Sequence, residues 1–472
     1  MIASLPLLPP VIDQSIQRVA LDPAAAVGFL ALAAAAAYLG YKKSPIGAML
    51  LAFGVPFAAY RDVGNTTITI EKCIALGSAL GLLIGGAPLW PRSRAGQRVL
   101  LAGGVIVLTI ALSGFNATYS GPVAREFFKQ LEYLLLFWCA ATFIERSERS
   151  PTYLVTGVVA STAIVSVLAL FQGMIGGAPS GIWINGHPLQ RAAGTLEGPN
   201  QLAGFLEAAL PILWVWPAFA SYSKPVQQYV TATSSAAMIL TLSRAGVVVA
   251  GASLVLLYYL RRPLARASLI PMLVGAGVGI VAIGAWAVLW AHATIADLSH
   301  LAYFDIPGNP GGVGTREQLW PAALKLFLMH PLLGVGAGNY QLLLPTVGLH
   351  GIETHAGSLW LQTLAEQGVV GFLALLAFGI VALRETFALR AQSPLALAAF
   401  LALTSLLAHQ LVDDLFFFPK VASLCWLLLG AGTCTYRHGE EVLSGNGRLH
   451  PEARARQPLE RTPVNVTGSP KP

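Results

Sequence analysis

Apolar stretches of about 20 residues, the length an α-helix needs to cross a bilayer, recur along most of this chain of 472 residues. Hydrophobic residues make up 55% of the chain and charged residues 11%, against about 25% charged residues in soluble domains. The pattern therefore predicts an all-α polytopic membrane protein and excludes a soluble enzyme. In such a chain the net charge of +7 reflects basic cytoplasmic loops, so we expect no nucleic-acid partner.

The bilayer-length criterion predicts about 12 to 13 transmembrane helices. Basic residues cluster in alternate connections, which the positive-inside rule makes cytoplasmic. We therefore expect a membrane domain over residues 1–436, followed by a disordered cytoplasmic tail over residues 437–472. The predicted spans lie near residues 24–41, 45–60, 69–89, 98–113, 126–143, 152–174, 200–220, 226–243, 246–260, 267–291, 357–383, 394–412 and 416–435.

The same alternation places the two long connections, about residues 175–199 and 292–356, on the periplasmic side. Several cations fall at the outer ends of spans, against the positive-inside trend. For two of them, Arg61 and Arg125, snorkelling or contact with lipid phosphate is a sufficient explanation, and the role of Lys129 stays open. The remaining cations have local sequences that indicate a more specific role.

Three arginines come from three separate segments on this outer side. Arg191 opens a Gly- and Pro-containing loop that leads into a helix with Asn200 in its first turn. Arg244 lies in a short break between two spans, and Arg316 begins an amphipathic helix that we expect along the membrane surface. Because a guanidinium binds phosphate through two parallel hydrogen bonds and stays charged at any working pH, the three could converge on one anionic group.

His355 stands where the polar part of the second long loop meets an apolar stretch that we expect to form an unbroken helix. An imidazole there can accept a proton from a hydroxyl near neutral pH, although a capping histidine would look the same in sequence. His350 and His355 are five residues apart, which is not the spacing that places two metal ligands on one helical face. We therefore expect no metal site. Glu366 is expected deeper in the membrane, too far from His355 to orient it, where it would pair with a polar group of another helix.

The order of these motifs resembles the superfamily of O-antigen ligases and Wzy-type O-antigen polymerases. The resemblance covers roughly the C-terminal two-thirds, with a core near residues 150–412, and one departure is Ala356, where the family often has asparagine. The motifs are Arg191…Gly194…Pro199-Asn200, Ser243-Arg244, Arg316…Trp320, Pro331-Leu-Leu-Gly-Val-Gly…Asn339-Tyr340 and His355…Leu359…Leu364-Ala-Glu366-Gln-Gly…Gly371.

The resemblance implies a GT-C-type glycosyltransferase of the bacterial inner membrane, with its active site facing the periplasm and its long periplasmic loop carrying short helices. It implies an undecaprenyl-diphosphate-linked glycan as donor, lipid A core or another glycan as acceptor, and no cofactor or metal. By the same resemblance His355 is the catalytic base, while Arg191, Arg244 and Arg316 contact the diphosphate and Asn200 supports them.

The sequence leaves alternatives open. A ligase, a polymerase and a protein O-glycosyltransferase share the donor chemistry, so only the acceptor would separate them. A lipid-linked glycan transporter is the alternative from another class, and it predicts internal repeats and cations near the midplane of the membrane. No repeat is evident here, and the cations gather at the outer ends of the spans.

Overall fold

The computed structural model describes residues 23–57, 60–63, 66–175, 180–185, 187–289, 291–294 and 313–434. Each of the predicted spans contains a helix. The boundary expected between residues 436 and 437 lies outside the described residues, as does the part of the second long loop from 295 to 312. The helices at the predicted spans are α1 (Pro23–Tyr41), α2 (Pro45–Gly54), α3 (Ile70–Ile84), α4 (Arg94–Ser113), α5 (Ser120–Arg146), α6 (Ser150–Ile175), α7 (Pro199–Val215), α8 (Lys224–Leu240), α9 (Arg244–Leu260), α10 (Arg262–Leu289), α14 (Leu359–Leu389), α15 (Pro394–His409) and α16 (Pro419–Gly432).

Five helices in the described part are long and apolar enough to cross a membrane, namely α4, α5, α6, α10 and α14. The prediction of an all-α polytopic membrane protein is therefore confirmed. The last two helices are shorter than their predicted spans: α15 has 16 residues and α16 has 14. At about 1.5 Å per residue neither covers a hydrocarbon core of ~30 Å, so the turn that joins them can lie below the membrane surface.

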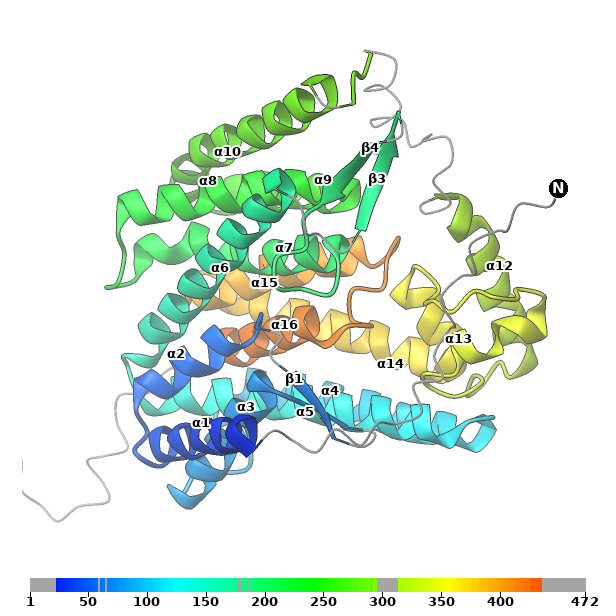
Figure 1. The fold of residues 1–472 in the computed structure, drawn as a ribbon. Helices are drawn as coiled ribbons and strands as arrows, with labels where there is room; N and C mark the ends of the chain where they lie inside the picture. Colours follow the sequence, from blue (N-terminus) through cyan, green and yellow to red (C-terminus); the bar gives the residue numbers. More distant parts are fainter. Residues whose placement is uncertain are drawn as a thin grey trace, which may run out of the picture. The chain divides into compact units, whose positions relative to one another are not determined.

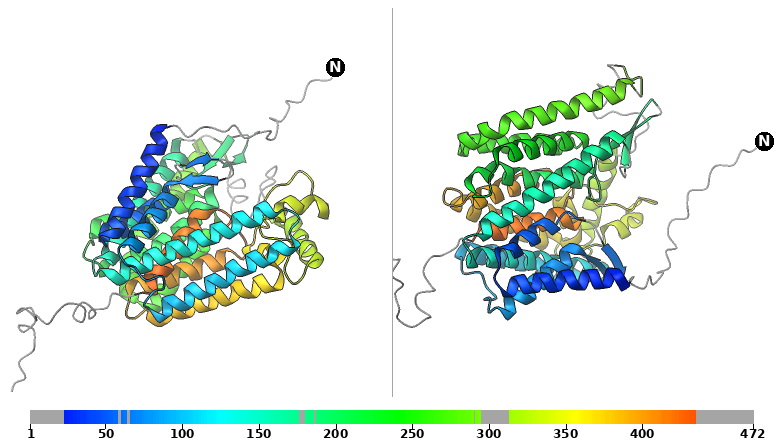
Figure 2. Two further views of the ribbon diagram at one scale, coloured as in Figure 1. Left: turned by 90° about the horizontal axis from the view of Figure 1, so that it is seen from below. Right: turned by 60° about the vertical axis from the view of Figure 1, so that its left-hand side comes forward.

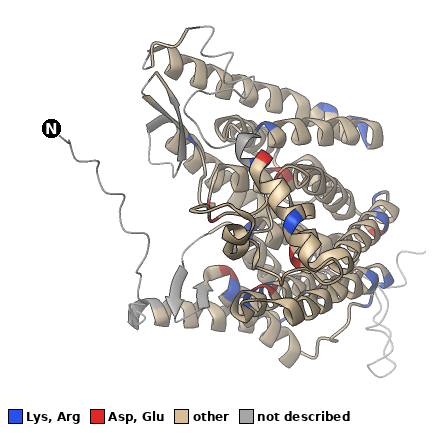
Figure 3. Cartoon of the chain, turned by 90° about the vertical axis from the view of Figure 1, so that its right-hand side faces the viewer, with Lys and Arg blue, Asp and Glu red and all other residues tan. Residues whose placement is uncertain are grey.

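Helices far apart in the sequence lie side by side (Figures 1 and 2). Helix α4 packs on α14, α5 on α16, and α7 on α15, while α8 lies against α10. The core between them is apolar, with Phe137, Phe205 and Trp214 at most 1% exposed. The outward side chains of α10 are apolar as well, with Ile270 70% exposed, as expected of a surface that faces lipid. Figure 3 shows how sparse charged residues are over the described ribbon.

Two short antiparallel hairpins were not expected from the sequence. One pairs β1 (Tyr60–Val63) with β2 (Thr66–Thr69). The other lies in the first long loop and pairs β3 (Ser180–Ile184) with β4 (His187–Arg191). Arg191 is the last residue of β4, opposite Ser180. The hairpin therefore delivers Arg191 to the short loop that leads into α7.

The second long loop contains short helices, as expected. Helix α12 (Val313–Met329) ends just before His330, and α13 (Tyr340–Leu343) continues into the 3₁₀ turn η3 (Leu344–Val347). The buried face of α12 is formed by Leu319, Ala322, Ala323 and Leu326, which recur at helical spacing. Helix α12 packs on α14 with this face.

The expected unbroken helix after His355 is wrong in one respect: α14 is broken at Gly368, where φ is 64° and ψ is −164°. Segment 331–336 packs into the break. The Val369 amide donates to the Pro331 carbonyl at 2.9 Å, and the Val335 amide donates to the Ala365 carbonyl at 3.0 Å. These bonds satisfy backbone groups that the break would leave unpaired in an apolar environment. The break thus ties the loop that carries α13 to the membrane helix below His355.

Candidate active site

Asp413, in the turn between α15 and α16, lies at the centre of the predicted site residues. Its Oδ2 atom accepts a hydrogen bond from Asn200 Nδ2 at 2.6 Å and lies 4.0 Å from Arg316 Nη2. Its Oδ1 atom lies 3.9 Å from Nε2 of His355. The side chain is only 4% exposed, so these partners replace water around a buried carboxylate.

Asn200, near the start of α7, connects Asp413 to Arg191. Its Oδ1 atom accepts a hydrogen bond from Arg191 Nη2 at 2.9 Å, and Arg191 Nε donates to the Thr241 carbonyl at 2.8 Å. Burial lowers the pKa of Arg191 to about 10, with repulsion from Arg244 adding to this effect and attraction to Asp413 opposing it. Arg191 therefore stays charged near neutral pH although most of its side chain is shielded from water.

Arg244 begins α9, directly after a sharp turn in which Leu242 has a φ of 53°. Its charge interacts with those of Arg191 and Arg316. The structure thus brings together the three predicted arginines, which come from β4, α9 and α12. Arg191 and Arg316 are tied to the Asp413 carboxylate, and Arg244 interacts electrostatically with both of them. Three guanidinium groups and one carboxylate leave an excess of positive charge, which suits an anion of higher charge than Asp413 alone.

His355 lies in the loop that leads into α14 and is held on three sides. Its Nδ1 atom accepts a hydrogen bond from the Gly357 amide at 3.1 Å, and its ring lies 5.3 Å from the ring of Phe417. With Nδ1 as an acceptor, the neutral imidazole carries its proton on Nε2, the atom that faces Asp413. Gly357 has a φ of 66° and lies against the side chain of Arg316, so the turn after His355 depends on glycine.

Glu366 pairs with the start of α13, a polar group of another helix as expected, and is linked to the His355 loop through Gln362 rather than by a contact with His355. Its Oε1 atom accepts hydrogen bonds from Gln362 Nε2 at 2.8 Å and from the Tyr340 amide at 3.1 Å. Gln362 in turn accepts a hydrogen bond from the Ala356 amide at 2.7 Å. The helix begins at Leu359, so His355 and Ala356 lie in the preceding loop, and Gln362 in the first turn of α14 links this loop to Glu366.

A buried acid–histidine pair lies under the Asp413 turn. His409, the last residue of α15, lies 2.6 Å from Glu207 of α7, measured from Nδ1 to Oε1. The two side chains are 1% and 0% exposed. This bond joins the end of α15 to α7, and the Leu359 amide joins the start of α14 to the Asp413 carbonyl at 3.0 Å. Three membrane helices are therefore fixed around one turn.

Residues 229–376 match the model of the Wzy_C family, described as O-antigen ligase. This part of the chain is similar to the O-antigen ligase family. The match confirms the predicted resemblance and supports a glycosyltransferase activity of the ligase or polymerase type. No curated protein matches the chain.

The matched residues contribute only part of the candidate site. Arg244, Arg316 and His355 lie within the matched residues, whereas Arg191, Asn200 and Asp413 come from outside them. The hairpin before the matched residues and the turn after them therefore complete the arrangement around His355.

Sequence analysis missed Asp413, Asp414, Gln362 and the Glu207–His409 pair. A signal was present for the first two, because adjacent acidic residues between two apolar stretches are expensive in a membrane and usually have a partner. Gln362 gives no such signal, because a single glutamine in a long apolar stretch is compatible with a continuous helix. Arg125, assigned to the membrane surface, is 59% exposed and lies 3.9 Å from Glu126.

Proposed function

We propose that this protein is an O-antigen ligase-like glycosyltransferase. It moves a glycan from an undecaprenyl-diphosphate donor to an acceptor hydroxyl of lipid A core on the periplasmic face of the inner membrane. The observation that carries the proposal is the convergence of Arg191, Arg244 and Arg316 beside the paired His355 and Asp413. A cationic group for a departing diphosphate and a base for an acceptor hydroxyl are the two elements that this reaction needs.

In the proposed step the acceptor oxygen forms a bond to the anomeric carbon of the glycan. The bond from that carbon to the phosphate oxygen breaks, and its electron pair leaves with undecaprenyl diphosphate. The arginines stabilise the charge on this leaving group. The acceptor proton passes to the imidazole of His355.

Asp413 supports the proton transfer in two ways. Facing Nε2–H, it favours the tautomer in which Nδ1 is the basic nitrogen, and its negative charge stabilises the imidazolium that forms. Nδ1 is shared with the Gly357 amide at 3.1 Å, so the acceptor hydroxyl takes the place of that amide when it binds.

The glycan profile of a strain that lacks this protein tests the proposal. Loss of polymer from lipid A, together with full-length lipid-linked chains that accumulate, supports a ligase. Single-repeat products instead support the alternative, a Wzy-type polymerase with the same donor chemistry. Lipid-linked glycan trapped on the cytoplasmic side would indicate a transporter, and an unchanged profile would overturn the proposal.

A further inference from the structure

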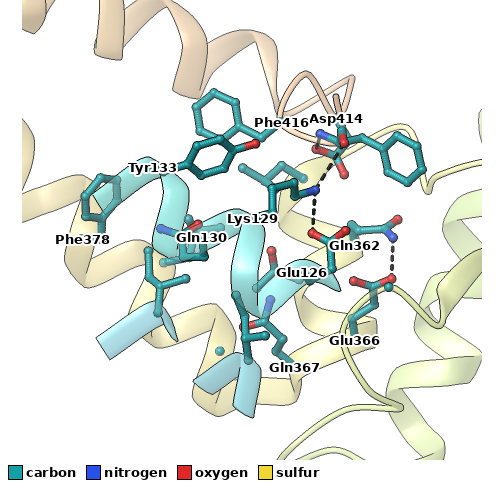
Figure 4. A pocket seen from close by; sticks show the side chains of 18 of the residues that line it. Glu126, Lys129, Gln130, Tyr133, Gln362, Glu366, Gln367, Phe378, Asp414 and Phe416 are labelled. Atoms are coloured by element: carbon teal, nitrogen blue, oxygen red, sulfur yellow. Dashed lines mark hydrogen bonds and ion pairs between the residues drawn. The ribbon is translucent and has the colours of Figure 1, made fainter. Parts of the chain in front are cut away.

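A cavity with both apolar and polar lining residues lies beside the candidate active site, between helices α4, α5 and α14 and the α15–α16 turn. Its volume is about 100 Å³. A cavity that holds one water needs roughly 10–15 Å³ on this scale, so the space exceeds what a single buried water requires. Side chains from α5 and α14 point into it, with Glu126, Lys129 and Gln130 on one side and Gln362 and Glu366 on the other (Figure 4).

Two of the lining side chains have polar atoms without a hydrogen-bond partner among the described residues. They are the amide nitrogen of Gln130, a residue 9% exposed, and the hydroxyl of Tyr133, which is 3% exposed. A buried polar atom of this kind costs about 1–3 kcal/mol when nothing pairs with it. Two such atoms on one wall, one turn of α5 apart, indicate a bound molecule with acceptors and donors of its own.

The charges of the cavity disfavour an anion. Three carboxyl side chains, Glu126, Glu366 and Asp414, line it against one ammonium group, Lys129. None of the three arginines of the active site is among its lining residues. A phosphate or diphosphate here would meet more negative than positive groups, so the diphosphate of the donor belongs on the arginine side.

A metal cation is disfavoured too, because an ammonium group already occupies the acidic end. Lys129 Nζ lies 2.6 Å from Glu126 and donates to the Phe417 carbonyl at 3.3 Å. One oxygen of Glu366 and one of Asp414 accept backbone amide protons. The free amide nitrogen of Gln130 is a donor, which would repel a cation.

The remaining walls suit a ring with hydroxyl groups. The aromatic side chains of Tyr133, Phe416 and Phe417 line the cavity together with amides and carboxylates. Sugar hydroxyls donate and accept at once and match such mixed polar groups, while the apolar faces of the ring match aromatic walls. Phe417 is shared with the active site, since its ring lies 5.3 Å from that of His355.

We propose that this cavity binds a neutral sugar ring, with Gln130 and Tyr133 as its hydrogen-bonding residues. The assignment of this ring to the acceptor, rather than to the donor glycan, rests on the proposed function. The acceptor assignment follows from the division of charge: the arginines bind the diphosphate on one side of His355, and the uncharged ring enters from the Phe417 side. His355 then lies between the two substrates.

Binding can be tested without turnover, on the purified full chain in lipid nanodiscs. Saturation-transfer difference NMR would be recorded with methyl glycosides of glucose, galactose, N-acetylglucosamine and a heptose. We expect saturation transfer to at least one of them, and its loss in the double variant Gln130→Leu/Tyr133→Phe. The matched control is Thr162→Val, which removes a buried unpartnered hydroxyl from α6, away from the cavity. No transfer with any glycoside, or transfer retained by a folded double variant, overturns the proposal.

A kinetic comparison assigns the ring to one substrate, with polymer-free lipopolysaccharide core as acceptor and undecaprenyl-diphosphate glycan as donor. For an acceptor sugar, each single variant should raise the KM for acceptor by about tenfold and leave the KM for donor unchanged. A rise confined to the donor KM would overturn the acceptor assignment. The NMR experiment needs no turnover, so it tests the sugar-binding cavity independently of the proposed function. Glycosides can fail to bind while the glycan profile still supports a ligase.

Discussion

The carboxylate of Asp413 faces the imidazole of His355, with 3.9 Å between Oδ1 and Nε2. The same carboxylate accepts a hydrogen bond from Asn200, which in turn accepts one from Arg191. One buried carboxylate therefore connects the proposed base to Arg191, which is proposed to bind the diphosphate. This arrangement couples the position of the base to that of the leaving group, so a change at Asp413 should affect both.

Asp413→Asn should lower kcat by about 10²- to 10⁴-fold, the range for a group that supports proton transfer. The variant keeps the size of the side chain but removes the charge that stabilises imidazolium. The acid side of the pH–rate profile should therefore move to lower pH, because imidazolium then forms less readily. A purely structural residue would alter stability and leave the shape of this profile unchanged, so the profile decides between the two roles.

The three arginines should respond to substitution in the same graded way. Charge-assisted hydrogen bonds contribute roughly 1.5–3 kcal/mol each, so Arg191→Ala, Arg244→Ala and Arg316→Ala should each lose most turnover. Lysine keeps the charge but not the paired geometry, so the lysine variants should keep part of the donor affinity. Arg125→Ala, at a side chain that is 59% exposed, is the control. Normal donor KM and turnover in all three alanine variants would leave the cluster with a structural role only.

Sequence patterns located the helices well because each of them lies in an apolar stretch, although only five of the described helices are long and apolar enough to cross a membrane. They also indicated the three arginines and His355 as candidate site residues, since charged groups near apolar stretches are conspicuous, and the roles of these residues stay predictions. The break in α14 could not be read from the sequence. Gly368 stands in an apolar stretch that is compatible with a continuous helix, and only the packing of segment 331–336 explains the interruption. The link from Glu366 through Gln362 to the His355 loop follows from that tertiary contact as well.

Gly368→Ala should destabilise the folded protein by more than about 2 kcal/mol, because the combination of positive φ with extended ψ at this position is essentially restricted to glycine and alone costs roughly 1–3 kcal/mol for a residue with a Cβ atom. A Cβ atom there would also overlap the backbone of Leu332. Gly379→Ala in the same helix is the matched control, since its Cβ atom would meet only Leu407 Cδ1, at 3.4 Å. Thermal unfolding in nanodiscs measures both, and equal stability of the two variants would contradict a specific role for the break.

Asp414 should make stability depend on pH. Burial raises the pKa of this carboxyl from 3.8 to about 6, with repulsion from Asp413 and Glu126 adding and attraction to His355 and Lys129 opposing. The folded state therefore binds the proton more tightly than the unfolded chain. The protonated Asp414 carboxyl therefore contributes its full stabilisation of the folded state below pH 4, and this contribution is lost as pH rises towards 6.

The free energy of unfolding of the Asp414→Asn variant should not fall over this pH range. At pH 7 it should exceed that of the wild type by on the order of 3 kcal/mol, since one pKa unit corresponds to about 1.4 kcal/mol. Melting temperatures measured from pH 4 to 7 would show it. Glu148→Gln, at an exposed carboxyl, controls for a general effect of lost charge. A wild-type pH dependence in the Asp414 variant would assign the titration to another group.

His355 is the proposed base, and its contacts allow it to be removed without loss of the fold. It accepts one hydrogen bond, from Gly357, and its side chain remains 19% exposed. His355→Ala should therefore stay folded and bind the donor but turn over about 10²- to 10⁴-fold more slowly. His330→Ala, at an exposed histidine of the same loop region, is the control and should retain its activity.

A capping histidine would give the opposite result, with a lower melting temperature and nearly normal specific activity. Added imidazole separates the two further, because a free base can enter the space that the side chain leaves. We expect it to restore part of the turnover of His355→Ala, increasingly so as pH rises and the added imidazole becomes neutral. Added imidazole should not restore the turnover of the Arg244→Ala variant, because this variant lacks a positive charge rather than a base. Wild-type turnover by a folded His355→Ala protein would rule out the proposed proton transfer.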